Sequence, residues 1–158
     1  MVDSHDRVLI RNALIDNYNA YAQGLDSKDW ALVRSCFADE VYIDYGIVGP
    51  DAGDPPVPRS ADDWLQVLQG VINRFDITRH TITNHRSVFD GAEVSCSAYL
   101  IADHVKFSDP AMPFVGPEDV ITVVGEYTNF YQRERDSWKI HRSKLVVNWS
   151  SGNPALVP

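Results

Sequence analysis

The first half of the chain has the apolar spacing of amphipathic helices. Between about residues 6 and 24, apolar side chains recur every three or four positions, at Ile10, Leu14, Tyr18, Tyr21 and Leu25. Asp26 or Ser27 can cap a second, short helix and Ser60 can begin a third, because such side chains accept hydrogen bonds from the free N–H groups of a first turn. The pattern therefore predicts three helices, the second of which carries Trp30, Val33 and Phe37.

After Asp76 the apolar period changes to the two-residue alternation of β-strands. The Asp90-Gly91 pair favours a tight hairpin turn between the first two of four such runs, which lie at 77–89, 92–107, 120–132 and 137–149. A shorter run at 41–45 alternates in the same way, whereas the prolines of 49–58 make that segment a loop. The sequence thus predicts an α+β fold, in which helices pack on a curved, mostly antiparallel meander of strands.

Composition limits both the size of the fold and its partners. With 158 residues, 44% of them apolar, the chain can bury one core, so we expect a single domain over 1–158, with a core from about 6 to 149 and an irregular tail at 150–158. The net charge of −8 disfavours nucleic acid and anionic membranes as partners. Cys36 and Cys96 have no metal-binding spacing, and no apolar signal segment is evident, so a cytoplasmic protein with reduced cysteines is expected.

Three polar side chains have positions that suit proton transfer. Alternation along 92–107 places His104 in a row of small apolar residues, so His104 is expected to point inward. His80 and His85 fall on opposite faces of their strand unless a bulge changes the parity, and His80 is the favoured partner of Asp26. A carboxylate bonded to a histidine fixes the tautomer and raises its basicity, which makes Asp26 and His80 a candidate general-base pair. From the residues alone, Asp26 as a helix cap and His80 as a structural strand histidine remain open.

Aromatic residues are numerous enough to line a pocket for a flat, hydrophobic ring substrate. The candidates for this lining are Trp30, Trp64, Phe75, Phe114, Tyr127 and Trp149. A metal is not expected, because strand residues four and five apart, such as His80, Asn84 and His85, cannot face one ion without a bend.

The order of these motifs resembles the SnoaL-like branch of the nuclear transport factor two-like superfamily over nearly the whole chain. The resemblance rests on the run from Leu25 to Trp30, on the strand ending at Tyr45, on Arg79-His80, and on the segment from Glu126 to Ile140. These motifs are similar to those of scytalone dehydratases, bile acid 7α-dehydratases and hexachlorocyclohexane dehydrochlorinases, which eliminate water or HX from a ring. Three departures from the scytalone dehydratase pattern argue against scytalone itself as the substrate: Leu25, Gly125 and Tyr127.

The resemblance implies a cone-like α+β barrel and a cofactor-free lyase of the dehydratase type. It implies a catalytic set in which His80, oriented by Asp26, removes a proton next to a carbonyl, His104 protonates the leaving group, and Tyr21 or Tyr45 binds the enolate. Polyketide-type cyclases or isomerases that use the same pair, and non-catalytic binding or oligomerisation modules, remain alternatives. Relatives assemble through the open face of the sheet, so a homo-oligomer is expected, a trimer before a dimer.

Overall fold

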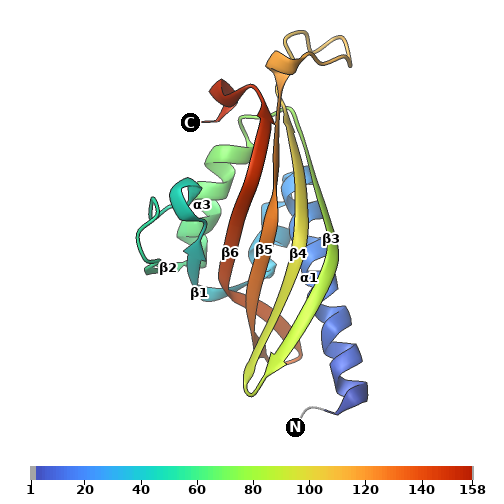
Figure 1. Ribbon diagram of the computed structural model, residues 1–158, viewed down its shortest axis with the longest axis vertical. Helices are drawn as coiled ribbons and strands as arrows, with labels where there is room; N and C mark the ends of the chain where they lie inside the picture. The colour runs from blue at the N-terminus through green and yellow to red at the C-terminus, as the bar shows by residue number, and fades with distance from the viewer. Residues whose placement is uncertain (1–2, 158) are drawn as a thin grey trace.

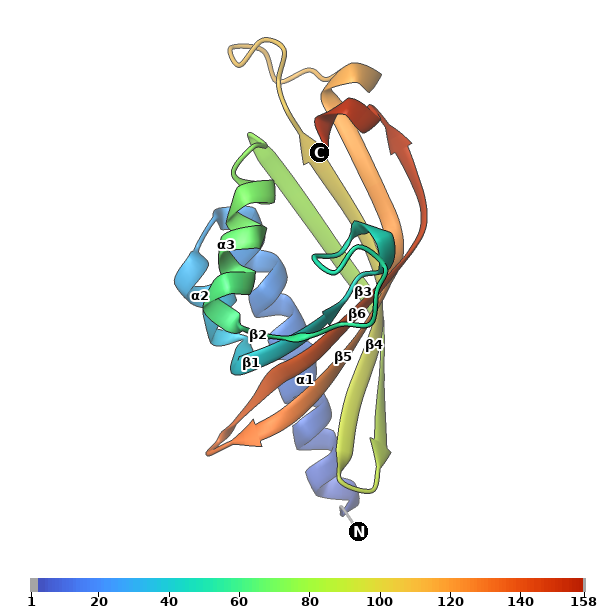
Figure 2. The same ribbon diagram turned by 90° about the vertical axis from the view of Figure 1, so that its left-hand side faces the viewer.

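Three helices pack on the concave side of a strongly curved sheet (Figures 1 and 2). The structure is a computed structural model that describes residues 3–157. The helices are α1 (Ser4–Ser27), α2 (Trp30–Ser35) and α3 (Ala61–Ile72). The strands are β1 (Phe37–Asp44), β2 (Pro58–Ser60), β3 (Ile77–Asp90), β4 (Glu93–Val105), β5 (Val120–Glu134) and β6 (Ser137–Gly152). The described residues also include three short 3-10 helices: η1 (Gly46–Val48), η2 (Pro117–Asp119) and η3 (Pro154–Leu156).

The six strands form one open sheet in the order β2-β1-β6-β5-β4-β3. The last four strands make the antiparallel meander that the alternating runs predict, and β1 joins the sheet by pairing in parallel with β6. The predicted α+β class and the curved, cone-like arrangement of helices on the sheet are therefore confirmed, although the sheet does not close into a complete barrel.

The turn between α1 and α2 differs from the prediction. Neither Asp26 nor Ser27 caps the second helix, because α1 continues to Ser27 and ends only where Lys28 adopts a left-handed conformation, with φ of 57°. Asp29 is the N-cap instead, and its carboxylate accepts a hydrogen bond from the Leu32 backbone N–H at 3.0 Å. Helix α2 is also shorter than expected, so Phe37 begins strand β1.

Among the register shifts of the sheet, two change which side chains near the helices point inward. In β3, Asn84 has φ of 57° and the register to β4 shifts between Thr83 and Arg86, so an extra residue interrupts the alternation. His85 therefore faces the same side as His80, rather than the opposite side that strict alternation predicts. In β6, a second shift lies where Val124 pairs with Trp149 but Gly125 pairs with Val147.

The end of the chain is more regular than predicted. Strand β6 runs to Gly152, and Asn153 caps η3 through a hydrogen bond from the Ala155 backbone N–H at 3.0 Å. The Asn153 side chain also donates to the Glu118 carbonyl at 2.9 Å, which ties the chain end to the loop between β4 and β5. Among residues 3–157, no helix has the length and apolar character needed to cross a membrane.

Candidate active site

The last turn of α1 brings Asp26 to the start of β3. Gly24 lets α2 pack closely against the same turn, since a Cβ at this position would lie 2.7 Å from Val33 Cγ2 on α2. Lys28 then fixes the helix end by donating from Nζ to the Phe75 carbonyl at 2.8 Å, just before β3 begins. A carboxylate is unfavourable at the negative end of a helix dipole, so Asp26 needs compensating donors.

Three donors from β3 converge on the Asp26 carboxylate. The Thr78 hydroxyl donates to Oδ1 at 2.9 Å, the His80 backbone N–H donates to Oδ2 at 3.0 Å, and His80 Nδ1 lies 2.7 Å from Oδ1. An ionised carboxylate can only accept hydrogen bonds, so Nδ1 carries a hydrogen, and in the neutral ring Nε2 then has a free lone pair. The pair thus has the geometry of an oriented general base.

Hydrogen bonding keeps Asp26 ionised in spite of its partial burial. Burial raises the pKa of the Asp26 carboxyl, but the hydrogen bonds from the His80 ring, the His80 backbone N–H and the Thr78 hydroxyl outweigh it. The net pKa lies below its usual value. The His80 side chain is only 5% exposed, so solvent screens this pair weakly.

His104 lies on β4 beside His80, with ring centroids 5.4 Å apart. The Phe75 ring packs on its other side at 5.0 Å, and His104 as a whole is 8% exposed. Burial, followed by the neighbouring His80, lowers the pKa of His104 to about 4, so its ring is neutral at pH 7. Its Nδ1 has no hydrogen-bond partner among the described residues. His104 can therefore exchange hydrogen bonds with a ligand, but it is not a ready source of protons at neutral pH.

His80 and His104 both line a cavity of about 520 Å³ between the helices and the sheet. Most of the other lining is apolar and comes from α3, β5 and β6, including Leu68, Val71, Ile121, Val123, Leu145 and Val147. Ile47 and Val48 of η1 and Val157 near the chain end lie at its border, where Ile47 is 86% exposed. The volume and lining suit a small, largely hydrophobic molecule.

Tyrosine side chains form a buried wall of the same cavity. Tyr21, Tyr45 and Tyr127 all line it, and the Tyr127 ring lies 6.1 Å from Tyr21 and 6.0 Å from Tyr45. Burial is the main cause that raises the pKa of each of these phenols. All three therefore stay protonated at neutral pH and can donate hydrogen bonds. Tyr45 also exchanges a hydrogen bond with Ser143 at 3.2 Å.

Only two of the six aromatic residues predicted to bind substrate line this cavity. Trp64 and Tyr127 do, and the buried Trp64 Nε1 has no partner among the described residues. The other four lie elsewhere: Trp30 on the half-buried first turn of α2, Phe75 behind His104, Phe114 in the exposed β4–β5 loop and Trp149 on the outer face of β6. The β6 bulge explains the last case, because it turns Ser150 rather than Trp149 toward the cavity.

Sequence reasoning missed Thr78 and most of the aliphatic lining. Thr78 lies two residues before His80 on the same face of β3, so alternation could have identified it. The lining residues of β5 and β6 have no chemical signature of their own. Between residues 3 and 157, no group of three His, Cys, Asp or Glu side chains is placed to bind a metal ion.

The open, curved sheet covered by three helices places the chain in the class of nuclear transport factor two-like α+β cone proteins. Within that class, the chain belongs to the SnoaL-like domain family, whose model matches residues 6–144. No curated protein gives a significant match.

Solved structures with the same fold cover nearly the whole chain. The Kfla4162 protein of Kribbella flavida is 28% identical, with a TM-score of 0.77 over 92% of this chain and 95% of that one. The type-3 hexachlorocyclohexane dehydrochlorinase LinA of Novosphingobium barchaimii is 19% identical, with a TM-score of 0.73 and coverage of 96% and 95%. A protein of Novosphingobium aromaticivorans named as a candidate scytalone dehydratase is 17% identical, with a TM-score of 0.72 over 94% of both chains. Neighbours of this fold thus include proteins named as lyases.

Proposed function

We propose that this protein is a cofactor-free lyase that eliminates water, or another HX, from a cyclic hydrophobic hydroxy-carbonyl compound. The observation that carries this proposal is the 2.7 Å contact between Asp26 and His80 Nδ1 at the wall of a mostly apolar cavity. The names of the structural neighbours give independent support for elimination chemistry. A pure binding module would not need an ionised carboxylate that orients an otherwise buried imidazole.

Proton abstraction is assigned to His80 Nε2. This nitrogen takes a proton from the carbon next to the substrate carbonyl, and the electron pair of that C–H bond forms the enolate. Asp26 stabilises the resulting imidazolium through the hydrogen bond at Nδ1. The protonated phenols of Tyr21 and Tyr45 are the donors available to the enolate oxygen, and the low polarity of the cavity strengthens such bonds.

Departure of the leaving group completes the elimination. The electron pair of the enolate forms the ring double bond while the C–O bond breaks, and the leaving hydroxide takes up a proton to depart as water. Because His104 is neutral at pH 7, the proton that His80 has just accepted is the one available for this step. His104, 5.4 Å from His80, contributes a hydrogen bond that positions the leaving oxygen.

The cavity also supports the proposed class of substrate. Its aliphatic lining from α3, β5 and β6 fits a ring without charge, whereas its polar groups gather near His80, His104 and the tyrosines. The unpartnered Trp64 N–H can donate to a further oxygen on that ring. A neutral cyclic β-hydroxyketone meets these requirements.

The test is a screen of cyclic β-hydroxyketones in the presence of a metal chelator. We expect loss of water, detected by mass spectrometry, and exchange of the α-proton in D2O for analogues that lack the leaving hydroxyl. Asp26→Asn should slow both reactions by about 10²- to 10⁴-fold, because His80 loses its charged partner.

Asp29→Asn is the matched control. It removes the same charge three residues away, and asparagine is as good an N-cap as aspartate, so activity and stability should stay at the wild-type level. Equal rates for Asp26→Asn and wild type, or no exchange with any compound of the panel, would contradict the proposal.

We also propose that several copies of this chain assemble into a homo-oligomer. On the outer face of the sheet, four apolar side chains are each between 47% and 61% exposed: Tyr99, Ile101, Val146 and Trp149. Because an apolar sheet face is stabilised by a partner, we expect a homo-oligomer, a trimer before a dimer, and sedimentation velocity measures it.

A further inference from the structure

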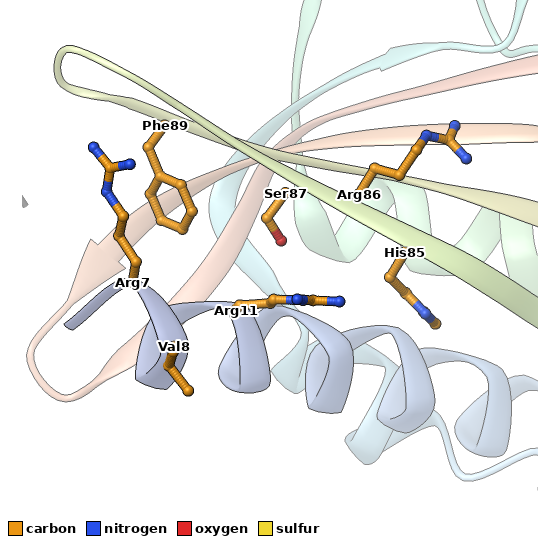
Figure 3. Close-up of a pocket in the computed structure, with 7 residues that line it drawn as sticks. All are labelled: Arg7, Val8, Arg11, His85, Arg86, Ser87 and Phe89. Carbon is orange, nitrogen blue, oxygen red and sulfur yellow. The ribbon is translucent and has the colours of Figure 1, made fainter. Parts of the chain in front are cut away.

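A second hollow lies on the other half of β3, away from the active-site cavity. It is a groove of about 440 Å³ between the first turns of α1 and the end of β3. Figure 3 shows Arg7 and Arg11 of α1 on one side, and His85, Ser87 and Phe89 of β3 on the other. None of the groups assigned to the proposed chemistry lines this groove.

Two of the three arginines that line this groove have no acidic partner within residues 3–157. Of the three arginines that line it, Arg86 is paired with Glu126, and its guanidinium points away from the groove (Figure 3). Within residues 3–157, no ion pair is formed by Arg7 or Arg11. Such a concentration of positive charge is unusual on a chain with a net charge of −8. The local field in the groove therefore attracts anions.

His85 adds an unsatisfied polar atom at the inner end of the groove. Its Nε2 is buried and has no hydrogen-bond partner among the described residues, while its ring packs edge-on against Tyr18 at 5.2 Å. Burial lowers the pKa of His85, and the charge of Arg11 lowers it further, so the guanidinium acts directly on this ring. A buried polar atom without a partner requires an explanation, and a ligand supplies one.

We infer that this groove is a binding site for the phosphate group of a small soluble molecule, separate from the active site. Arg11, whose guanidinium extends toward His85, supplies a positive charge at the inner end (Figure 3). Arg7, whose guanidinium lies beside Phe89, supplies a second one at the outer end. Guanidinium groups bind phosphate oxygens in pairs. His85 Nε2 and the Ser87 hydroxyl, which now makes only a long 3.6 Å contact with Cys96 Sγ, are the inner donors. Phe89, with Arg7 stacked 5.6 Å from its ring centroid, offers apolar contact to the rest of the ligand.

Titration of the full-length protein with inorganic phosphate tests this site. Calorimetry gives the affinity, and the NMR signals of the His85 ring report where phosphate binds. We expect saturable binding with a shift of the His85 ring signals, and Arg11→Gln should weaken binding by about tenfold or more because a charge-assisted bond is lost. Arg7→Gln, in the exposed first turn of α1, should weaken phosphate binding as a second, independent test.

Arg74→Gln is the matched control, since Arg74 is an exposed arginine next to α3, outside the groove, and its replacement changes the net charge equally. If Arg11→Gln and Arg74→Gln weaken phosphate binding to the same extent, or if the His85 signals do not move, the site is refuted. Thermal unfolding of each variant without phosphate checks that the fold is intact.

A phosphate could also be carried by a lipid, so vesicles containing phosphatidic acid form a separate arm. We expect no sedimentation of the protein with them, because its net charge of −8 opposes approach to an anionic surface. Sedimentation that Arg11→Gln abolishes would overturn the assignment to a soluble ligand.

Discussion

The two halves of strand β3 present the same residue type to opposite electrostatic environments. His80, in the first half, bonds to the Asp26 carboxylate at 2.7 Å and lines an apolar cavity. His85, five positions later, faces the guanidinium of Arg11 and lines an open, basic groove. A neighbouring anion prepares one imidazole to accept a proton, whereas a neighbouring cation leaves the other suited to bind an anion.

The difference depends on the bulge at Asn84. In a regular strand with the same residues, side chains an odd number of positions apart lie on opposite faces. One of the two histidines would then point away from the helices. The extra residue brings both onto the inner face, where different segments of α1 cover them. The charge of the helix residue above each histidine then determines the role of that histidine.

The largest expected effect is a difference in the rate of elimination between variants of His80 and of His85. His80→Gln should reduce the rate of elimination by about 10²- to 10⁴-fold, since the general base is lost. His85→Gln should leave that rate unchanged, because His85 does not line the active-site cavity. Steady-state kinetics on a compound from the screen measures both. An equal loss in the two variants would show that the halves of β3 act as one site.

The pH dependence of stability extends the comparison to a histidine without a charged partner. The folded-state pKa of His104 is about 4, below the usual value of 6.5, so the unfolded chain binds a proton that the folded chain does not. Stability should therefore fall as the pH is lowered from about 6.5 to 4, with a contribution of about 3 kcal/mol from this buried side chain.

Urea unfolding at a series of pH values measures this slope. In His104→Gln the contribution should be absent, so between pH 6.5 and pH 4 the wild type should lose about 3 kcal/mol more of its free energy of unfolding than the variant does. Parallel curves for the two proteins would contradict the assignment of a neutral, buried His104.

A smaller effect is expected at the bulge itself. Asn84→Ala should lower the free energy of unfolding by about 1 kcal/mol, because alanine tolerates a φ of 57° less well than asparagine. Asn84→Gly should be less damaging, since glycine adopts positive φ without a steric penalty. Urea unfolding of the three proteins tests the order, and a more stable alanine variant would be inconsistent with the left-handed conformation.

The smallest effect is expected from a reversal of the charge next to His85. Arg11→Glu gives this histidine an acidic neighbour, as His80 already has, so the pKa of His85 should rise from its lowered value. NMR titration of the ring measures the change. A pKa that stays lowered would mean that burial alone controls His85.

Much of the fold could be predicted from the sequence because periodicity determines it. The four long strands, the Asp90-Gly91 turn and the three helices all follow from the spacing of apolar residues and from local turn chemistry. The exact end of α1 could not be predicted in this way. It depends on the left-handed Lys28 and on the close contact of Gly24 with Val33, and both are tertiary features.

The candidate site was predictable to a lesser degree. Asp26 and His80 do meet, but alternation alone placed His85 on the wrong face and gave no warning of the β6 bulge that turns Trp149 outward. A bulge adds one residue without changing the hydrophobic composition of a strand, so its position is not evident from a single sequence. The expected proton donor, His104, is neutral at pH 7 because of burial, which depends on the folded environment.

The bulge in β3 also has a genetic consequence. Loss of the single codon for Asn84 would remove the bulge and restore regular alternation, with Thr83 facing outward and His85, Ser87 and Phe89 still facing the helices. One in-frame deletion would thus shorten the strand without exchanging the side chains of its two faces. A change of one codon at Asn84 would therefore preserve the basic groove, whereas a regular strand that kept all of its residues would turn this row of side chains outward.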